Sequence, residues 1–281
     1  VADGTIVLYT TGKDISDSVS ISNKNTNGKD LTAFYYKANN SIKAEWEDAI
    51  TLSYGDVKKN LPNIEKVFEE INANKDKAID YEIIFNTPVE FKTLTLPTYA
   101  NSITFSGEDM TYTGTALKLP VTTTFACNLN AENTTITASK DVTLKNADIK
   151  SITGTRTSKL GVTGTLNAES VKTFSVVDAI TGEIVAETNV TVTDFIGNLT
   201  ATTPKTVVSI AKAYDAEIKL VSDANEKFAK VTVNDVAEDE EIAVSVVDGN
   251  DELISLFSNT PVLYSSSDIA ENVTISNETA N

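Results

Sequence analysis

Few residues in this 281-residue chain are of the types that perform acid–base or nucleophilic catalysis. The sequence has no histidine, one cysteine, Cys127, and one arginine, Arg156. Ser-His-Asp and Cys-His sites therefore cannot form within it. Cys127 lies in the strand-like segment TTFACNL and is predicted to be a small core residue, whereas Arg156 lies in the turn-like segment GTRTSKLG and is predicted to be solvated. The composition indicates a non-enzymatic protein, although folding could still bring two carboxylates together.

Two acidic segments are candidates for binding calcium. Asp239 and Glu240 lie in AEDEEIAV, and Asp248 and Asp251 lie in VVDGNDELI. Carboxylate and backbone oxygens are the ligands that Ca²⁺ prefers. Neither segment has the spaced D-x-D-x-D-G pattern of a calcium loop, and Asp-Gly is also a typical turn pair. We therefore expect no cofactor, with calcium at these four residues as the alternative to solvated loops.

Aromatic residues are concentrated near the beginning of the chain. Tyr35, Tyr36 and Trp46 lie in LTAFYYKANNSIKAEWEDAITL. Exposed rings of this kind stack on sugars, which makes the three residues candidates for glycan binding. They are interspersed with apolar residues that favour strands, so burial in the core or against a helix is the favoured interpretation.

One segment, NLPNIEKVFEEINAN, has the periodicity of an amphipathic helix. Four apolar residues fall at positions i, i+3, i+4 and i+7: Ile64, Val67, Phe68 and Ile71. Asn60 is the predicted N-cap, and Pro62 is compatible with a first helical turn. The pattern predicts a helix from about residue 61 to about residue 73.

From Tyr81 onward the period is two, with short strands separated by Asn, Asp, Gly or Ser. Two series of apolar residues recur about every 20 residues: Phe105, Phe125, Leu144 and Val162; and Val121, Val142 and Val162. This repeat predicts a mostly β protein, a parallel β-solenoid with one short N-terminal helix, whose coils bury their inward residues against each other. Tandem β-sandwich modules are the alternative. In residues 133–155 the predicted inward residues are Ile136, Val142, Leu144 and Ile152.

A longer repeat joins the two ends of the sequence. VLYTTGKDISDSVSISN, residues 7–23, aligns with VLYSSSDIAENVTISN, residues 262–277, when one residue near Lys13 is skipped. The offset between them is 254 to 255 residues, and the shared VLY and D-I words favour a true repeat over chance similarity. Residues 262–277 would then be the start of a next module.

The periodicities predict three parts. Residues 1–80 are expected to hold strands and a capping helix, residues 81–225 the solenoid, and residues 226–281 a C-terminal β cap, with a hairpin-rich piece over 230–248. A cap is expected because an open strand edge at the end of a solenoid promotes aggregation.

The charge balance restricts the partners. The chain has 23 basic and 40 acidic residues, a net charge of −17. An acidic surface opposes binding to nucleic acid and to anionic membranes. No apolar run long enough for membrane insertion and no signal peptide are expected from the pattern.

The words TLTLP…SITF and DVTLKNA, after an amphipathic helix and the strand DYEIIF, resemble the β-solenoid repeat modules of large secreted adhesin-like surface proteins of Gram-positive gut bacteria. The likeness covers about residues 56–200. It implies an extracellular, cell-surface or secreted protein in which this chain is a structural or adhesive module. Its partners would be a host or cell-surface protein, a glycan, or adjacent copies of the same module. A carbohydrate-binding or carbohydrate-active β-helix is the alternative.

Overall fold

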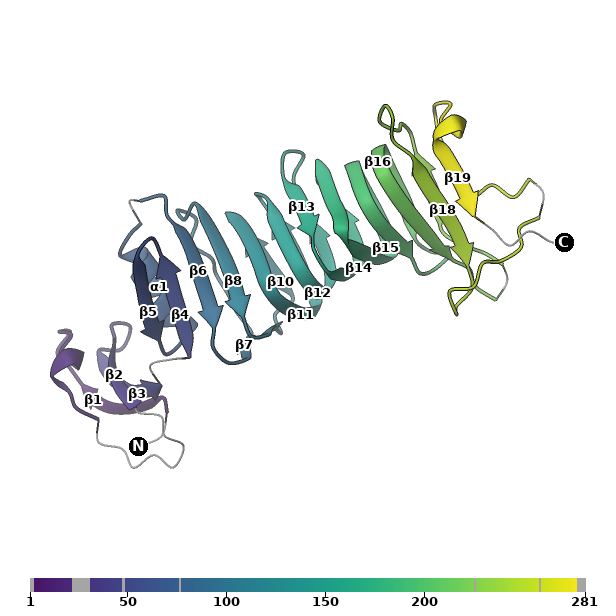
Figure 1. The fold of residues 1–281 in the computed structure, drawn as a ribbon. Helices are drawn as coiled ribbons and strands as arrows, with labels where there is room; N and C mark the ends of the chain where they lie inside the picture. Colours follow the sequence, from purple (N-terminus) through teal and green to yellow (C-terminus); the bar gives the residue numbers. More distant parts are fainter. Residues whose placement is uncertain are drawn as a thin grey trace.

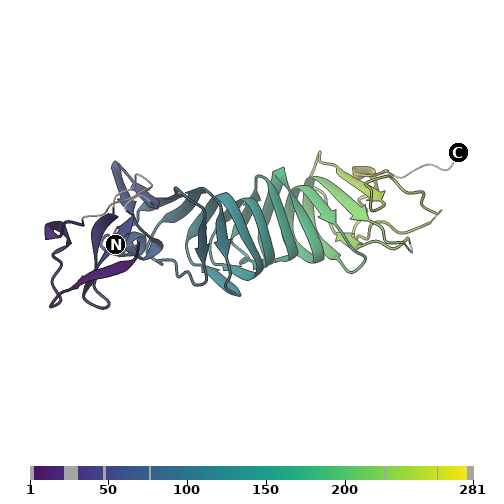
Figure 2. The same cartoon turned by 90° about the horizontal axis from the view of Figure 1, so that it is seen from below.

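The computed structural model describes residues 3–21, 31–46, 49–75, 77–224, 226–257 and 259–276. It is an elongated solenoid with the two ends of the chain at opposite ends of its long axis (Figure 1). Seen from below, the strands run across this axis one after another (Figure 2).

A small antiparallel sheet precedes the solenoid. It contains β1 (Thr5–Tyr9), β2 (Leu31–Tyr36) and β3 (Ser41–Trp46), in the order β1-β3-β2. A 3-10 turn, η1 (Ser16–Ser18), follows β1. Because β3 is in the middle, β1 is an edge strand, and no other described strand pairs with its second side.

The main sheet begins with an antiparallel cap. The hairpin of β4 (Ile50–Tyr54) and β5 (Val57–Leu61) pairs through β4 with β6 (Asp80–Phe85). Helix α1 (Ile64–Asn72) lies between this hairpin and β6 in the sequence, with Val67 and Ile71 fully buried. The predicted cap residue was wrong: Asn60 lies in β5, and the side chain of Asn63 accepts the Lys66 amide at 3.1 Å, because only Asn63 directly precedes the first turn.

From β6 onward, all pairings between the described strands of the main sheet are parallel. The further strands are β7 (Val89–Phe91), β8 (Ser102–Gly107), β9 (Met110–Tyr112), β10 (Ala116–Leu119), β11 (Thr122–Ala138), β12 (Val142–Thr153), β13 (Lys159–Val162), β14 (Thr165–Lys172), β15 (Val176–Ala201), β16 (Val207–Val221), β17 (Lys230–Val233), β18 (Ile242–Val247) and β19 (Val273–Ser276). They form about 8 solenoid turns. The predicted parallel β-solenoid is confirmed. The sandwich alternative is wrong, because antiparallel sheets would be required.

In successive coils, similar apolar residues lie directly above one another. Phe105, Phe125, Leu144 and Val162 are direct partners in neighbouring coils, as the first series predicts. The Phe105 and Phe125 rings are stacked with centroids 5.2 Å apart. The four residues predicted to point inward, Ile136, Val142, Leu144 and Ile152, are all buried. The second series was wrong in register, because Val142 pairs with Thr123 and Val121 precedes the strand.

Residues 230–248 continue the solenoid. β17 and β18 both pair in parallel with β16, so the hairpin-rich piece expected here was wrong. Asp and Gly turn signals do not distinguish a hairpin from the corner of a coil, which explains the error. A second 3-10 turn, η2 (Ala270–Asn272), precedes the last strand, β19. No helix among the described residues is long and apolar enough to cross a membrane.

The two halves of the long repeat, as far as they are described, contain the same local structure. In residues 7–21 the turn η1 follows Ile15, and in residues 262–276 the turn η2 follows Ile269. Residues 22, 23 and 277 of the repeat lie outside the described residues.

Candidate functional site

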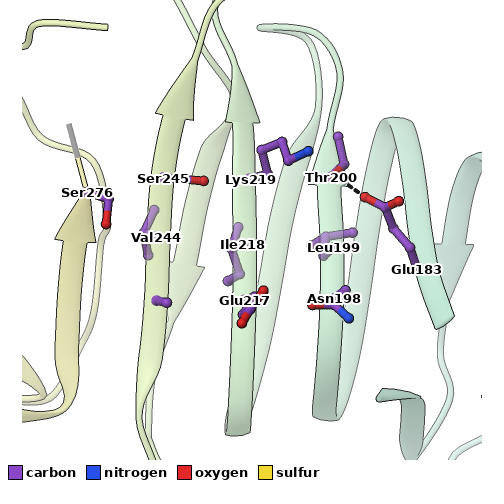
Figure 3. Close-up of a pocket in the computed structure, with 11 residues that line it drawn as sticks. Glu183, Asn198, Leu199, Thr200, Glu217, Ile218, Lys219, Val244, Ser245 and Ser276 are labelled. Atoms are coloured by element: carbon purple, nitrogen blue, oxygen red, sulfur yellow. Dashed lines mark hydrogen bonds between the residues drawn. The ribbon is translucent and has the colours of Figure 1, made fainter. Parts of the chain in front are cut away.

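A hollow of about 480 Å³ lies on the outer surface of the last coils and is the candidate binding site (Figure 3). Strands β15, β16 and β18 form its floor, and β19 lies at one end. Its polar lining residues are Glu183, Asn198, Thr200, Glu217, Lys219, Ser245 and Ser276.

Strand alternation explains why these residues face outward. Leu199, Ile218 and Val244 are direct partners across three coils, and each is 1% exposed. Their neighbours on either side must then point away from the core. The outward residues therefore form two rows across the strands, with Thr200 beside Lys219 and Ser245, and Asn198 beside Glu217.

The hollow offers hydrogen-bonding groups of both charge signs. The Thr200 hydroxyl donates to the Glu183 carboxylate, and the Asn198 amide donates to the Gly182 carbonyl at 3.2 Å. Lys219 lies 3.4 Å from Asp251 in a solvent-exposed ion pair. Glu217, on the exposed outer surface, is a second carboxylate, and no aromatic ring is among the lining residues. Such a surface can bind a polar ligand such as a sugar through hydrogen bonds.

The aromatic candidates lie in the small sheet, far along the chain from the hollow. Tyr36 is 2% exposed, and its hydroxyl donates to Glu45 and accepts from the Asn63 amide at 2.6 Å. Tyr35 is half-buried and donates to Asn40 at 2.9 Å, and Trp46 is half-buried. The burial favoured for this group is confirmed for Tyr36. The structure does not make the three rings one stacking platform, because neighbours in a strand point to opposite faces.

Tyr36 belongs to a buried polar cluster, consisting of Tyr36, Glu45, Asn63 and Lys66, where the small sheet meets α1. The Lys66 ammonium donates to the Tyr35 carbonyl and lies 4.3 Å from the centre of the Tyr36 ring. Burial raises the pKa of the Glu45 carboxyl, and burial likewise raises the pKa of Tyr36. Both groups therefore hold their protons more tightly than free side chains. The cluster links two elements and has no opening to a ligand among the described hollows.

The calcium candidates form two separate pairs at opposite ends of β18. Asp239 and Glu240 precede the strand, and Asp248 and Asp251 follow it. The Asp248 carboxylate accepts the amides of Asn250 at 2.8 Å and Glu252 at 3.0 Å. The amides of Glu252 and Asn250 lower the Asp248 pKa and both bind its Oδ1, and its Oδ2 accepts the Asn250 side-chain amide at 3.2 Å. Within the ranges that the structure describes, no three Asp, Glu, His or Cys residues are grouped to hold a metal.

The two single residues of reactive type are placed as predicted. Cys127 is 1% exposed inside the coil stack, and burial raises its thiol pKa to about 11. Arg156 is exposed in the turn between β12 and β13.

The sequence did not indicate the hollow. Thr200, Lys219, Ser245 and Ser276 are partners in successive coils, so the coil length changes from 19 to 26 and then to 31 residues. Because the coil length varies this much, the sequence does not predict which outward residues become neighbours in successive coils. The polar-apolar alternation in N-L-T and E-I-K was the available signal, but it is shared by most strands of the chain.

The chain matches no family model, no curated protein and no solved structure.

Proposed function

We propose that this chain is a non-enzymatic structural or adhesive module of a long extracellular protein at a bacterial cell surface. The observation that carries the proposal is the return of the initial segment, residues 7–21, at the far end of the solenoid as residues 262–275. A segment that recurs after one complete solenoid is the signature of tandem copies.

The physical properties of the solenoid support a spacer. Hydrogen bonds between parallel strands run from coil to coil along the long axis, so each coil is fixed to the next by a row of backbone bonds. The inward residues are apolar and stacked, and the outward ones are mostly Thr, Asn, Lys and Glu. The shape that results extends along one axis (Figure 1).

Surface labelling tests the location. Antibodies raised against the purified chain should label intact source cells, and brief external protease should remove the label. Labelling that requires permeabilised cells would refute an extracellular role. The matched control is an antibody against a cytoplasmic protein. This antibody must give no signal on the same intact cells.

The hollow over β15, β16 and β18 favours a second candidate function, the binding of a carbohydrate. We propose Glu217 and Lys219 as its hydrogen-bonding contacts, since both face the hollow. The purified chain should then give a signal on a glycan array, and Glu217→Gln should reduce this binding about tenfold. The reason is that a hydrogen bond to a charged group contributes roughly 1.5–3 kcal/mol. Glu169→Gln is the control, because Glu169 is exposed on β14 outside the hollow. Release of reducing sugar from a bound glycan would instead indicate a carbohydrate-active enzyme.

A further inference from the structure

We propose that residues 7–21 form the last coil of a preceding copy of this solenoid, so that two neighbouring copies share the segment at their boundary. The inference deepens the proposed function and rests on its tandem arrangement. It names the partner of an open surface at the beginning of the chain, and that partner is a second copy of the same sequence.

The docked form of the segment is visible at the other end of the molecule. Residues 262–276 close the last coil on two sides. The Tyr264 amide donates to the Val231 carbonyl at 2.9 Å, and the Val233 amide donates to the Tyr264 carbonyl at 2.9 Å. On the second side, β19 pairs in parallel with β18. Figure 1 shows β19 beside β18 at this end of the solenoid.

The undocked form has a similar backbone at its 3-10 turn. Ile15 has φ −128° and ψ 16°, and its counterpart Ile269 has φ −120° and ψ 12°. Asp14 accepts the Ser16 amide at 2.9 Å, and Asp268 accepts the Ala270 amide at 3.3 Å. The turn near the beginning of the chain therefore already has the conformation of its counterpart, whereas the backbone before it differs at Gly12, which has φ +91° next to the skipped residue Lys13.

The two forms differ in burial. Val262 and Ile269 are 5% and 8% exposed and belong to the main core. Their counterparts do not belong to any core, since Ile15 is 36% exposed and Val7 is half-buried. Tyr9 is 68% exposed and Tyr264 is 42% exposed. The apolar side chains that close a coil at one end are left uncovered at the other, as expected of a surface that lacks its partner.

The two pairings of the segment use opposite edges of one strand. The Thr10 amide donates to the Asn40 carbonyl, which follows β2, at 2.7 Å. Because backbone groups alternate along a strand, the amide and carbonyl of Tyr9 then point to the open edge of β1. These are the groups that the counterpart Tyr264 uses to bind β17. One strand can thus pair with β3 of its own copy and with β17 of the preceding copy at the same time.

The aligned residues of the initial segment are of types that could make similar side-chain contacts. Lys230 lies 5.1 Å from the centre of the Tyr264 ring, and Tyr9 supplies the same ring. Ser266 donates to Asn234 at 3.1 Å, and Thr11 supplies a hydroxyl at the aligned position. The amide of Asn272, which donates to the Glu240 carbonyl at 3.0 Å, is replaced by the hydroxyl of Ser18.

A two-copy chain tests the shared boundary. In this chain residue 261 is followed directly by residue 7 of a second copy, and amide hydrogen exchange is followed at single residues. In the single chain we expect fast exchange at Tyr9 and slow exchange at Thr10. At the junction we expect both to be slow, with Tyr9 protected at least about tenfold more than in the single chain. Fast exchange at the junction Tyr9, or loss of Thr10 protection when Tyr9 is protected, would overturn the proposal.

A chimera gives an independent readout within a single copy. Residues 262–276 are replaced by residues 7–22, and a matched variant receives the same 16 residues in scrambled order. We expect the β18 amides to keep their protection in the chimera and to lose it in the scrambled variant. Equal loss in both would show that residues 7–22 cannot close a coil. Neither outcome depends on where the protein is located, so the antibody test of the proposed function can fail or succeed separately.

Discussion

Tyr54 and Tyr81 have ring centroids 5.3 Å apart, but their hydroxyl groups have different surroundings. The Tyr54 hydroxyl donates to Glu70 at 3.0 Å. The Tyr81 hydroxyl is buried and has no hydrogen-bond partner among the described residues. A buried polar group without a partner loses its hydration without compensation, whereas a bonded one does not.

We therefore predict opposite effects for the same substitution at these two residues. Tyr81→Phe should raise the free energy of unfolding by about 1 kcal/mol, because it removes an unpaired hydroxyl. Tyr54→Phe, the matched control, should lower it by about 1 kcal/mol, because it removes a hydrogen bond. Urea unfolding of both variants measures the difference. A loss of stability in Tyr81→Phe equal to that in Tyr54→Phe would show that the Tyr81 hydroxyl is bonded.

The Glu45 carboxyl gives the stability a pH dependence. Burial raises its pKa in the folded state above the value of the unfolded chain. The folded protein therefore binds this proton more tightly, and the contribution of Glu45 to the free energy of unfolding decreases as the pH rises from the unfolded pKa of about 4.3 through the raised folded pKa.

Glu45→Gln should remove this contribution. We expect the stability difference between Glu45→Gln and the wild type to change in favour of the variant as the pH rises from about 4 to about 7. Glu217→Gln, on the exposed outer surface, is the control for the loss of a carboxylate as such. Unfolding by urea at several pH values checks both, and a pH-independent difference for Glu45→Gln would contradict the account.

Two successive coils approach each other closely at a pair of glycines. Gly182 in β15 lies directly above Gly164, and a Cβ atom at Gly182 would be 2.3 Å from the Gly164 carbonyl oxygen. That oxygen belongs to the backbone and cannot move without displacing a coil. Gly249, in the turn after β18, has no atom within 4 Å of the corresponding position.

Gly182→Ala should cost about 1–3 kcal/mol of stability through this overlap. Gly249→Ala should change the stability by less than about 1 kcal/mol. Thermal unfolding of the two variants gives the comparison. Equal stabilities would mean that the coils can separate at this corner without cost.

The elements also show what a sequence can and cannot predict. The series Phe105, Phe125, Leu144 and Val162 predicted the register because large inward residues must stack. The register predicted from Val121 was wrong because Val121 precedes the strand that begins at Thr122. Corners between strands interrupt the period of two. Helix α1 was found from its apolar stripe, but its cap was placed three residues early, because Asn60 and Asn63 are equally good cap residues in sequence.

The candidate site was less predictable than the fold, because it is composed of residues from different coils. The acidic pairs around β18 were visible as local runs, but their carboxylates are bonded in turns or lie apart. The hollow combines Glu183, Lys219 and Ser245, which are far apart in a chain whose coil length varies. Only the strand register brings them together.

The whole molecule would be a module that continues into the next copy. The small sheet at the beginning would extend the sheet of a preceding solenoid through β1, and the segment 262–276 already occupies the equivalent place at the end. The buried cluster of Tyr36, Glu45, Asn63 and Lys66 then fixes the small sheet to α1 of its own solenoid. A row of copies joined in this way would have no free hinge between the solenoids.

Small-angle X-ray scattering of the two-copy chain is the most direct test of this claim. The account predicts one straight rod, with the cross-section of the single chain and about twice its length. A distance distribution with two separate, broadened maxima would indicate a flexible pair and would contradict this claim. A compact particle in which the two copies lie side by side would also contradict it.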